Sequence, residues 1–142
     1  MGKNGVTGII VCLESDVTNR IFHHHEVYAM AVPSASTDLA EGDRIFFCDT
    51  AGKGLEGEAL IEKITFEPAR DLRRYGLDLY LFGEELTRYL AERGLKEDAT
   101  MLVLKVKEPT KYSKPLKCSL KVGRDGLYVN AEVTAQIMRE NL

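Results

Sequence analysis

The sequence predicts an α+β domain built on a curled, mainly antiparallel sheet, and two observations support this. The first is a strand, a Gly-rich turn and a second strand: residues 42–48 are apolar on both faces, and residues 54–61 follow closely. In the second strand Gly57, Ala59 and Ile61 alternate with acidic residues, as in a half-buried strand. The second observation is that strands and helices mix without regular alternation, which disfavours a parallel βαβ sheet.

The expected strands follow from apolar runs and period-two alternation. Gly54 and Gly57 indicate a bend or a close backbone approach, and the face pattern slips near residues 62–63, which predicts a bulge. Pro109 and Pro115 exclude a helix over 109–117, after which the chain can return to the sheet over 116–122. We therefore expect strands at 6–13, 27–32, 43–49, 55–66 and 100–107, with 43–49 and 55–66 paired as a hairpin.

Each expected helix has a start or stop signal in the sequence. Ser15 offers an N-cap for the first. Pro68 suits the first position of a short helix that Gly76 would end. Another helix begins near Gly83 and places Gly94 just after its end. The last helix is capped by Asn130 and carries Val133 and Ile137.

Length and composition place the chain in the class of ordinary globular domains. It has 142 residues, of which 44% are hydrophobic and 29% charged, so we expect a single domain over residues 1–142. No run approaches the ~18 apolar residues of a membrane span, and the first residues lead into a strand rather than a signal peptide. Neither membrane attachment nor an oligomeric state is indicated.

The three cysteines indicate a reducing compartment. Cys12, Cys48 and Cys118 are odd in number and far apart, and no C-x-x-C pair occurs. Cys48 follows three apolar residues, which favours burial over a reactive thiolate. We therefore predict a reduced cytoplasmic protein in which all three cysteines are small apolar side chains.

A strong charge asymmetry underlies the net charge of −3. Residues 105–124 contain seven basic residues and one acid, a balance of +6, which leaves −9 for the rest of the chain. Lys111, Lys114 and Lys117 recur every third residue, so in a polyproline-like conformation they would share an edge. Lys121 follows them, and Tyr112 could stack a base. Binding of a nucleic acid and a solvated basic loop are about equally good interpretations.

A second basic cluster surrounds Pro68. Arg70 and Arg73 or Arg74 are neighbours on one side of the expected short helix and could extend the basic face. Asp71 and Glu67 could equally neutralise them locally.

The turn at residues 50–54 is rich in glycine and carries Lys53, but it lacks the earlier glycine and the Ser/Thr after lysine of a phosphate-binding loop. Thr50 and Lys53 are kept as candidates because such a turn can border a ligand cleft. Glu56 and Glu58 share a strand face and could carry acid–base chemistry, although solvated carboxylates are the commoner explanation.

Metal binding is not predicted. His23, His24 and His25 are consecutive and point about 100° apart on a helix, so they cannot readily share one metal. No cysteine or carboxylate completes a recognisable ligand spacing, and no cofactor is implied.

The strand at 42–47 and the Gly54-x-x-Gly57-Glu58-Ala59 strand resemble those of the PUA-like superfamily, which includes the ASCH, EVE and YTH domains. The tail at 111–116, and 126–129 leading into a helix, are similar to a small archaeal family of uncharacterised PUA-like proteins. The resemblance covers nearly the whole chain and implies a PUA-like pseudo-barrel of mainly antiparallel strands with flanking helices. It also implies binding of RNA or a modified base. The Gly-x-Lys-x-x-Glu-x-Arg motif of typical ASCH domains is absent.

Three functions are consistent with these features. The first is an RNA- or nucleic-acid-binding domain that uses a basic edge and a cleft near the hairpin turn. The second is an enzyme that hydrolyses an amide on a modified nucleoside, with Thr50, Lys53 and Glu58 as nucleophile, activating base and acid–base group; it rests on fold analogy. The third is a protein-interaction module that uses exposed strand edges. The expected nucleic-acid-binding residues are Lys111, Tyr112, Lys114, Lys117, Lys121, Arg70 and Arg74.

Overall fold

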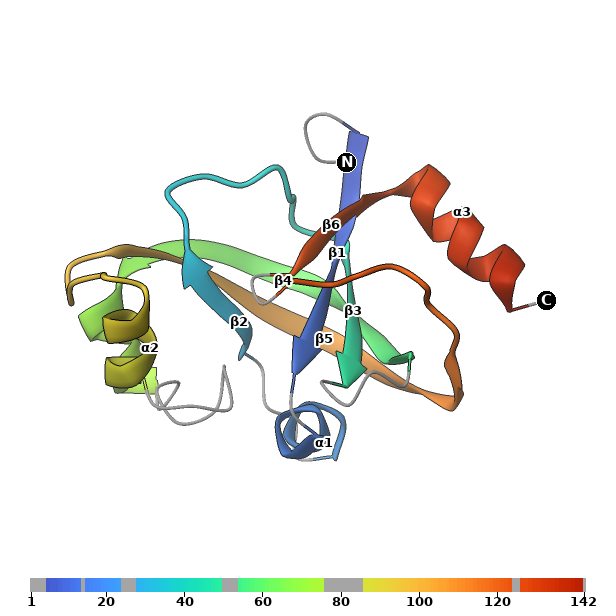
Figure 1. Ribbon diagram of the computed structural model, residues 1–142, viewed down its shortest axis with the longest axis horizontal. Coiled ribbons are helices and arrows are strands. Elements are labelled where there is room, and N and C mark those ends of the chain that lie inside the picture. The colour runs from blue at the N-terminus through green and yellow to red at the C-terminus, as the bar shows by residue number, and fades with distance from the viewer. Residues whose placement is uncertain are drawn as a thin grey trace.

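The computed structural model describes residues 5–13, 15–23, 28–49, 54–75, 86–123 and 126–141. Six strands, three α-helices and a 3-10 helix occur within these ranges (Figure 1). The strands are β1 (Val6–Leu13), β2 (Tyr28–Pro33), β3 (Arg44–Asp49), β4 (Leu55–Pro68), β5 (Thr100–Leu116) and β6 (Leu127–Asn130). The helices are α1 (Ser15–His23), the 3-10 helix η2 (Ala69–Tyr75), α2 (Leu86–Glu92) and α3 (Ala131–Glu140).

The strands form one sheet in the order β2-β5-β4-β3-β1-β6. The hairpin predicted from the Gly-rich turn is confirmed, because β3 and β4 pair antiparallel. All other pairs are antiparallel as well, except β1 with β3. This parallel pair was not predicted. It is possible because the chain between the two strands includes α1 and β2, which is long enough for a crossover. The predicted α+β class with a mainly antiparallel sheet is confirmed.

Two hydrophobic clusters lie on the opposite faces of β3, as its continuous apolar sequence predicts. Phe46 and Phe47 are both almost fully buried, and their side chains enter different clusters because successive strand residues alternate. Phe47 belongs to the α1-side core, made of Ile9, Val11, Leu13, Ile21, Leu39, Ile45, Phe47, Ala59, Ile61, Leu102, Leu104 and Val106. Phe46 belongs to the α3-side cluster, made of Ile10, Phe46, Cys48, Leu55, Val129 and Ile137.

The close approach predicted at the β4 glycines is confirmed. The Phe22 ring of α1 meets the Phe47 ring edge-to-face, with centroids 5.5 Å apart. A Cβ atom at Gly57 would overlap the Phe22 ring and the carbonyl oxygen of Thr110. The end of β5 lies equally close to Gly54, where a Cβ atom would overlap the carbonyl oxygen of Leu116. Glycine at 57 therefore lets α1 pack directly on the sheet.

Strands β4 and β5 form a long antiparallel ribbon that reaches beyond the rest of the sheet (Figure 1). The predicted bulge appears as a register shift between Ile61 and Lys63. β5 was expected to end near residue 107 but continues to Leu116. Within the described residues β2 pairs with β5 only up to Lys105, so the rest of β5 has β4 as its single neighbour. Pro109 is tolerated there because an edge strand can spare an N–H group.

The helix signals are partly confirmed. A helix does follow Pro68, as the 3-10 helix η2, and α3 begins after Asn130, whose Oδ1 accepts a 2.9 Å hydrogen bond from the Val133 amide. Gly94 follows α2 with φ of 66°, as expected for a residue after a helix. The helix start predicted near Gly83 and the helix end predicted at Gly76 both lie outside the described residues. No helix in the described ranges is long and apolar enough to cross a membrane.

Residues 117–123, here called the crossover segment, do not form a strand as predicted. They run from the end of β5 across the sheet to β6 at its far edge (Figure 1). Along this segment burial alternates, and Cys118, Leu120 and Val122 pack on the α3-side cluster. The segment therefore covers that face of the sheet with its apolar side chains instead of extending it.

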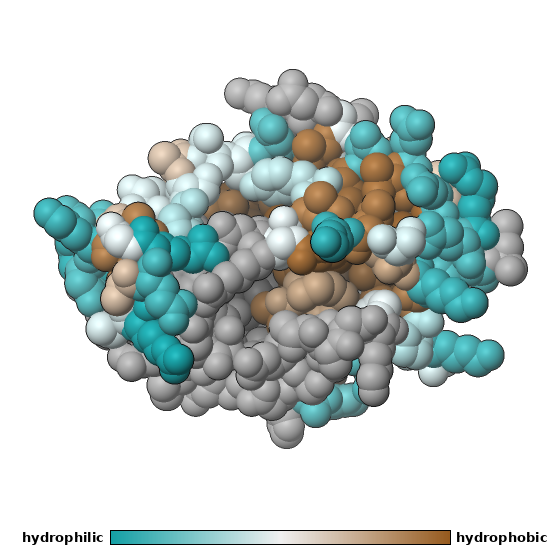
Figure 2. All heavy atoms as spheres, viewed as in Figure 1, coloured by the Kyte–Doolittle hydropathy of each residue, from teal (hydrophilic) through white to brown (hydrophobic). Residues whose placement is uncertain are grey.

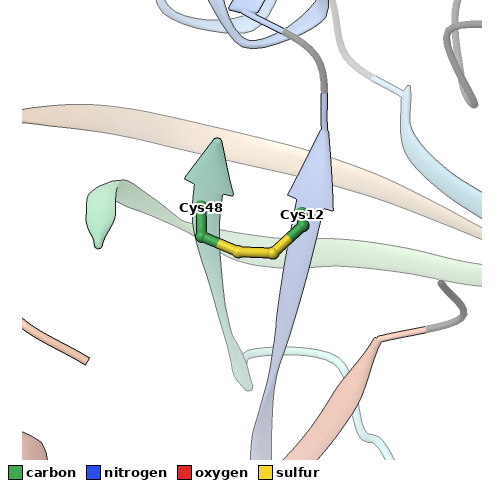
Figure 3. The surroundings of a disulfide bond; sticks show 2 residues. All are labelled: Cys12 and Cys48. Atoms are coloured by element: carbon green, nitrogen blue, oxygen red, sulfur yellow. A yellow bond between two sulfur atoms is a disulfide. The ribbon is translucent and has the colours of Figure 1, made fainter. Parts of the chain in front are cut away.

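The prediction that all three cysteines are separate reduced side chains is wrong. Cys12 and Cys48 form a disulfide (Figure 3). Parallel pairing of β1 with β3 places the two residues directly opposite each other, with Cα atoms 4.4 Å apart. The spacing of the cysteines along the chain does not predict this disulfide, because the disulfide depends on which strands are neighbours in the sheet. Cys118 is a free, partly exposed thiol.

Candidate nucleic-acid interface

The four predicted lysines lie together at one end of the β4–β5 ribbon and on the segment that follows. Lys111 pairs with Gly57 near the start of β4, and Leu116 pairs with Leu55. Lys111 and Lys114 lie on β5, while Lys117 and Lys121 lie on the crossover segment. All four side chains are exposed. We call this set the lysine end of the molecule.

The local geometry of these lysines differs from the prediction. A polyproline-like conformation was expected from 111 onward, but residues 111–116 belong to β5. Alternation along a strand places Lys111 and Lys114 on opposite faces, so the spacing of three does not align them. Lys114 instead shares the face of Tyr112 and Leu116, which both pack on the α3-side cluster.

The crossover segment presents its two lysines on one side. Lys117, Ser119 and Lys121 are exposed, and they alternate with the partly buried Cys118 and Leu120. An extended chain with alternating burial places residues two apart on the same side. Lys117 and Lys121 therefore point away from the sheet together.

The end of α3 fixes the position of this segment. The Lys117 amide donates a 2.7 Å hydrogen bond to Oδ1 of Asn141, and Nδ2 of Asn141 donates to the Lys117 carbonyl oxygen at 3.0 Å. Nδ2 also donates to the Ile137 carbonyl oxygen at 2.8 Å. Next to this clamp, the Ser119 hydroxyl donates to Oε1 of Glu140 at 2.9 Å. Glu140 thus places a carboxylate between the two lysines of the segment.

Tyr112 is held by Glu58. Its hydroxyl donates a 2.8 Å hydrogen bond to Oε1 of Glu58, and its half-buried ring packs on the α3-side cluster. Burial raises the pKa of the Tyr112 hydroxyl well above its usual value of 10, and the Glu58 carboxylate raises it further. Tyr112 therefore stays neutral, and its hydroxyl proton is engaged by Glu58.

Arg44 is the third member of the group that includes Tyr112 and Glu58. The sequence analysis did not predict a role for it. Nη1 of Arg44 lies 2.9 Å from Oε2 of Glu58, with side-chain exposures of 50% and 23%. On the paired strands Arg44 is opposite Leu60 and Phe46 is opposite Glu58, so Arg44 and Glu58 are diagonal neighbours on one face. A correct register for the β3–β4 hairpin would have been needed to find the pair.

Glu56 and Glu58 were predicted to share a strand face, and this is wrong. A register shift near the start of β4 leaves Glu56 opposite no single residue of β3. Oε2 of Glu56 instead accepts a 3.3 Å hydrogen bond from the hydroxyl of Thr18, a 2% exposed side chain on α1. The two carboxylates therefore have different partners on different elements, and they do not form an acid–base pair.

The arginines near Pro68 do not extend the lysine end. Arg70 and Arg74 lie in η2, directly after Pro68, which pairs with Thr100 at the other end of the ribbon. Eleven residue steps along each strand separate this pair from the Gly57–Lys111 pair, on the order of 35 Å along the ribbon. These arginines therefore do not continue the basic edge formed by the four lysines, because the long β4–β5 pairing places them at its other end.

The remaining candidates are only partly described. Thr50 and Lys53 lie outside the described residues, as do His24 and His25. In the described ranges no group of three or more His, Cys, Asp or Glu side chains could hold a metal ion.

A hydrophobic area borders the lysine end. Figure 2 shows it on the viewer's face, in the region where Figure 1 draws the crossover segment and β6, with hydrophilic side chains beside it. The apolar side chains that stay partly exposed on the α3-side cluster include Leu116, Leu120, Val122, Leu127 and Val133. This end of the molecule therefore presents lysines beside apolar surface.

Residues 6–131 match the family described as "Domain of unknown function (DUF365)". The chain belongs to the DUF365 family. No protein of curated function matches the sequence.

The fold is similar to that of solved ASCH structures. The crystal structure of ASCH from Zymomonas mobilis is similar to this chain with a TM-score of 0.67 at 13% identity, over 94% of both chains. A serine-to-alanine variant of that protein gives 0.69 at 12% identity, over 95% of this chain and 96% of that one. A tyrosine-to-phenylalanine variant gives 0.64 at 14% identity, over 94% and 97%. The predicted PUA-like pseudo-barrel is thereby confirmed.

Proposed function

We propose that this DUF365 protein binds single-stranded RNA or another nucleic acid through its lysine end. The observation that carries the proposal is the gathering of Lys111, Lys114, Lys117 and Lys121, all exposed, within one end of the fold. Lysines that neutralise phosphates release condensed counterions, which favours binding of a polyanion without sequence preference.

Tyr112 also belongs to the proposed interface, where we assign a role to its ring and none to its hydroxyl. Its hydroxyl proton is donated to Glu58, so the contact we propose for a base is with the ring, on the face that it shares with Lys114. Stacking needs no hydrogen bond, because every base offers a π face. Apolar side chains of the neighbouring hydrophobic area give a base a second contact.

Two other functions receive less support. Amide hydrolysis would need a Glu58 oxygen for proton transfer, but Oε1 accepts from Tyr112 and Oε2 is paired with Arg44. Strand addition would need an open, regular edge. The edge of β5 beyond Lys105 contains two prolines, several lysines and a residue with positive φ, Glu108 at 53°, which are the usual protections of an edge strand.

The proposal includes a cytoplasmic location in an archaeal source. Disulfides are rare in the cytosol of mesophiles, whereas intracellular proteins of hyperthermophilic archaea are rich in them. The Cys12–Cys48 bond is consistent with such a source.

The test is a salt titration of binding to a labelled single-stranded RNA, followed by fluorescence anisotropy. For wild type, log affinity should fall against log salt with a slope of roughly 0.7 per phosphate contact. Lys117→Ala and Lys121→Ala should each weaken binding and reduce the slope by about one contact. Lys96→Ala is the matched control, because this exposed lysine follows α2 at the other end of the ribbon. No binding at low salt, or equal effects of Lys96→Ala and Lys117→Ala, would remove the proposal.

A further inference from the structure

All three cysteines lie on the same face of the sheet. The disulfide joins Cys12 of β1 to Cys48 of β3, and both residues contribute to the α3-side cluster (Figure 3). Cys118 is free and packs against that cluster from the crossover segment. A free thiol and a disulfide thus share one hydrophobic contact region.

The strand register leaves Cys118 within possible reach of the disulfide. Cys12 pairs with Cys48, Cys48 with Leu55, and Leu55 with Leu116, which makes one row across β1, β3, β4 and β5. Leu116 and Cys48 are two strand spacings apart in this row, about 10 Å. From Leu116 the chain turns back over the same face toward β6, and Cys118 is its second residue (Figure 1). Two extended residues span up to ~7 Å, so Cys118 can reach the disulfide with its side chain.

We propose that the three cysteines form a thiol–disulfide exchange site. The Cys118 thiolate attacks Sγ of Cys48, the Cys48–Cys118 bond forms, and the Cys12–Cys48 bond breaks. Cys12 leaves as a thiolate and takes up the proton that Cys118 released. One disulfide and one thiol are present before and after, so the step needs no oxidant or reductant.

The exposure of the two bonded cysteines indicates which bond we expect to form. Cys48 is only 7% exposed, whereas Cys12 is partly exposed. A thiolate is better solvated at the more exposed position and therefore leaves more readily from Cys12. After exchange, the crossover segment is tied covalently to β3, and β1 keeps only its backbone pairing with β3. The site therefore has two covalent states that differ in which segment is bonded through sulfur to β3.

The first experiment uses the Cys12→Ser variant of the full chain, oxidised with glutathione disulfide and digested without reduction. Peptide mass spectrometry should find the Cys48–Cys118 bridge in most molecules. Cys48→Ser, which removes the attacked sulfur, should yield far less bridge between its two remaining cysteines. A Cys12→Ser protein with the circular dichroism of wild type but no Cys48–Cys118 bridge would overturn the proposal.

The second experiment uses unmutated protein, so that it does not depend on the folding of a variant. Wild type is incubated with a thiol-alkylating reagent, without oxidant or reductant, and the alkylated cysteines are identified by peptide mass spectrometry. Cys118→Ser is the control, because it keeps the Cys12–Cys48 bond but has no thiol to attack it. We expect label at Cys12 of wild type many-fold above this control, with a rate that rises with pH because the thiolate is the nucleophile. Equal labelling of Cys12 in the two proteins would overturn the proposal.

Discussion

Tyr112 and Glu58 connect β5 to β4 through a 2.8 Å hydrogen bond from the tyrosine hydroxyl to Oε1 of the carboxylate. Oε2 of the same carboxylate is paired with Arg44 of β3, so one glutamate joins three neighbouring strands. The group lies beside the lysine end and supports the part of β5 that carries Lys111 and Lys114.

Tyr112→Phe should destabilise the protein by about 1 kcal/mol, because it removes a hydrogen bond to a charged acceptor and leaves the packing of the ring. Urea denaturation at neutral pH measures this. Tyr128→Phe is the matched control, since its hydroxyl contacts Thr37 at 3.0 Å on the surface and should cost less. A larger loss for Tyr128→Phe would contradict the role given to Glu58.

The difference in stability between wild type and Tyr112→Phe should depend on pH. The pKa of Tyr112 is raised in the folded protein, mainly by burial and then by Glu58, so the neutral form is favoured by folding. Its contribution to stability is complete below the unfolded-state pKa of about 10 and declines as the pH rises above that value. Wild type should therefore lose its stability advantage over Tyr112→Phe between about pH 10 and 11, measured by urea midpoints. If the stability advantage of wild type over Tyr112→Phe instead grew over this pH range, the predicted direction of the pH dependence would be wrong.

Gly57→Ala should destabilise by roughly 1–3 kcal/mol, the usual cost of overpacking a core, because the new methyl group would overlap Phe22 and the Thr110 carbonyl. Gly123→Ala is the control, since open space surrounds that position. Thermal denaturation of both variants checks this, and similar melting temperatures would mean that α1 can shift away from the sheet at little cost.

Asn141→Ala should loosen the crossover segment, because Asn141 makes two hydrogen bonds to Lys117 and one to Ile137. We expect a loss of roughly 1–2 kcal/mol and faster hydrogen exchange at the Lys117 amide. Gln136→Ala, at an exposed position of α3, is the control. Unchanged exchange at Lys117 would show that packing of Cys118 and Leu120 alone holds the segment.

Glu140→Gln tests the proposed interface from the acidic side. Glu140 accepts from Ser119 between Lys117 and Lys121, so removal of its charge should strengthen RNA binding roughly twofold at low salt and less at high salt. The control Glu132→Gln changes an exposed acid in the first turn of α3. Anisotropy titrations at two salt concentrations decide this. Equal gains for both variants would indicate a general charge effect instead of a local one.

The sequence by itself determined the elements that depend on local signals. The β3–β4 hairpin follows from apolar alternation and a Gly-rich turn, the α3 cap from Asn130, and the bulge in β4 from a slip of the face pattern. The basic character of residues 105–124 is also a property of composition. Each of these signals acts within a few residues, and burial of one face enforces it.

The tertiary structure alone decided every feature that depends on strand order and register. It placed Cys12 opposite Cys48, Arg44 diagonal to Glu58, and η2 with Arg70 at the far end of the ribbon from Lys111. The period of three among the lysines was a poor guide, because β4 pairs with residues 111–116 and imposes a period of two. The physical reason is that pairing between distant segments depends on which faces must be buried together, and spacing along one chain does not contain that information.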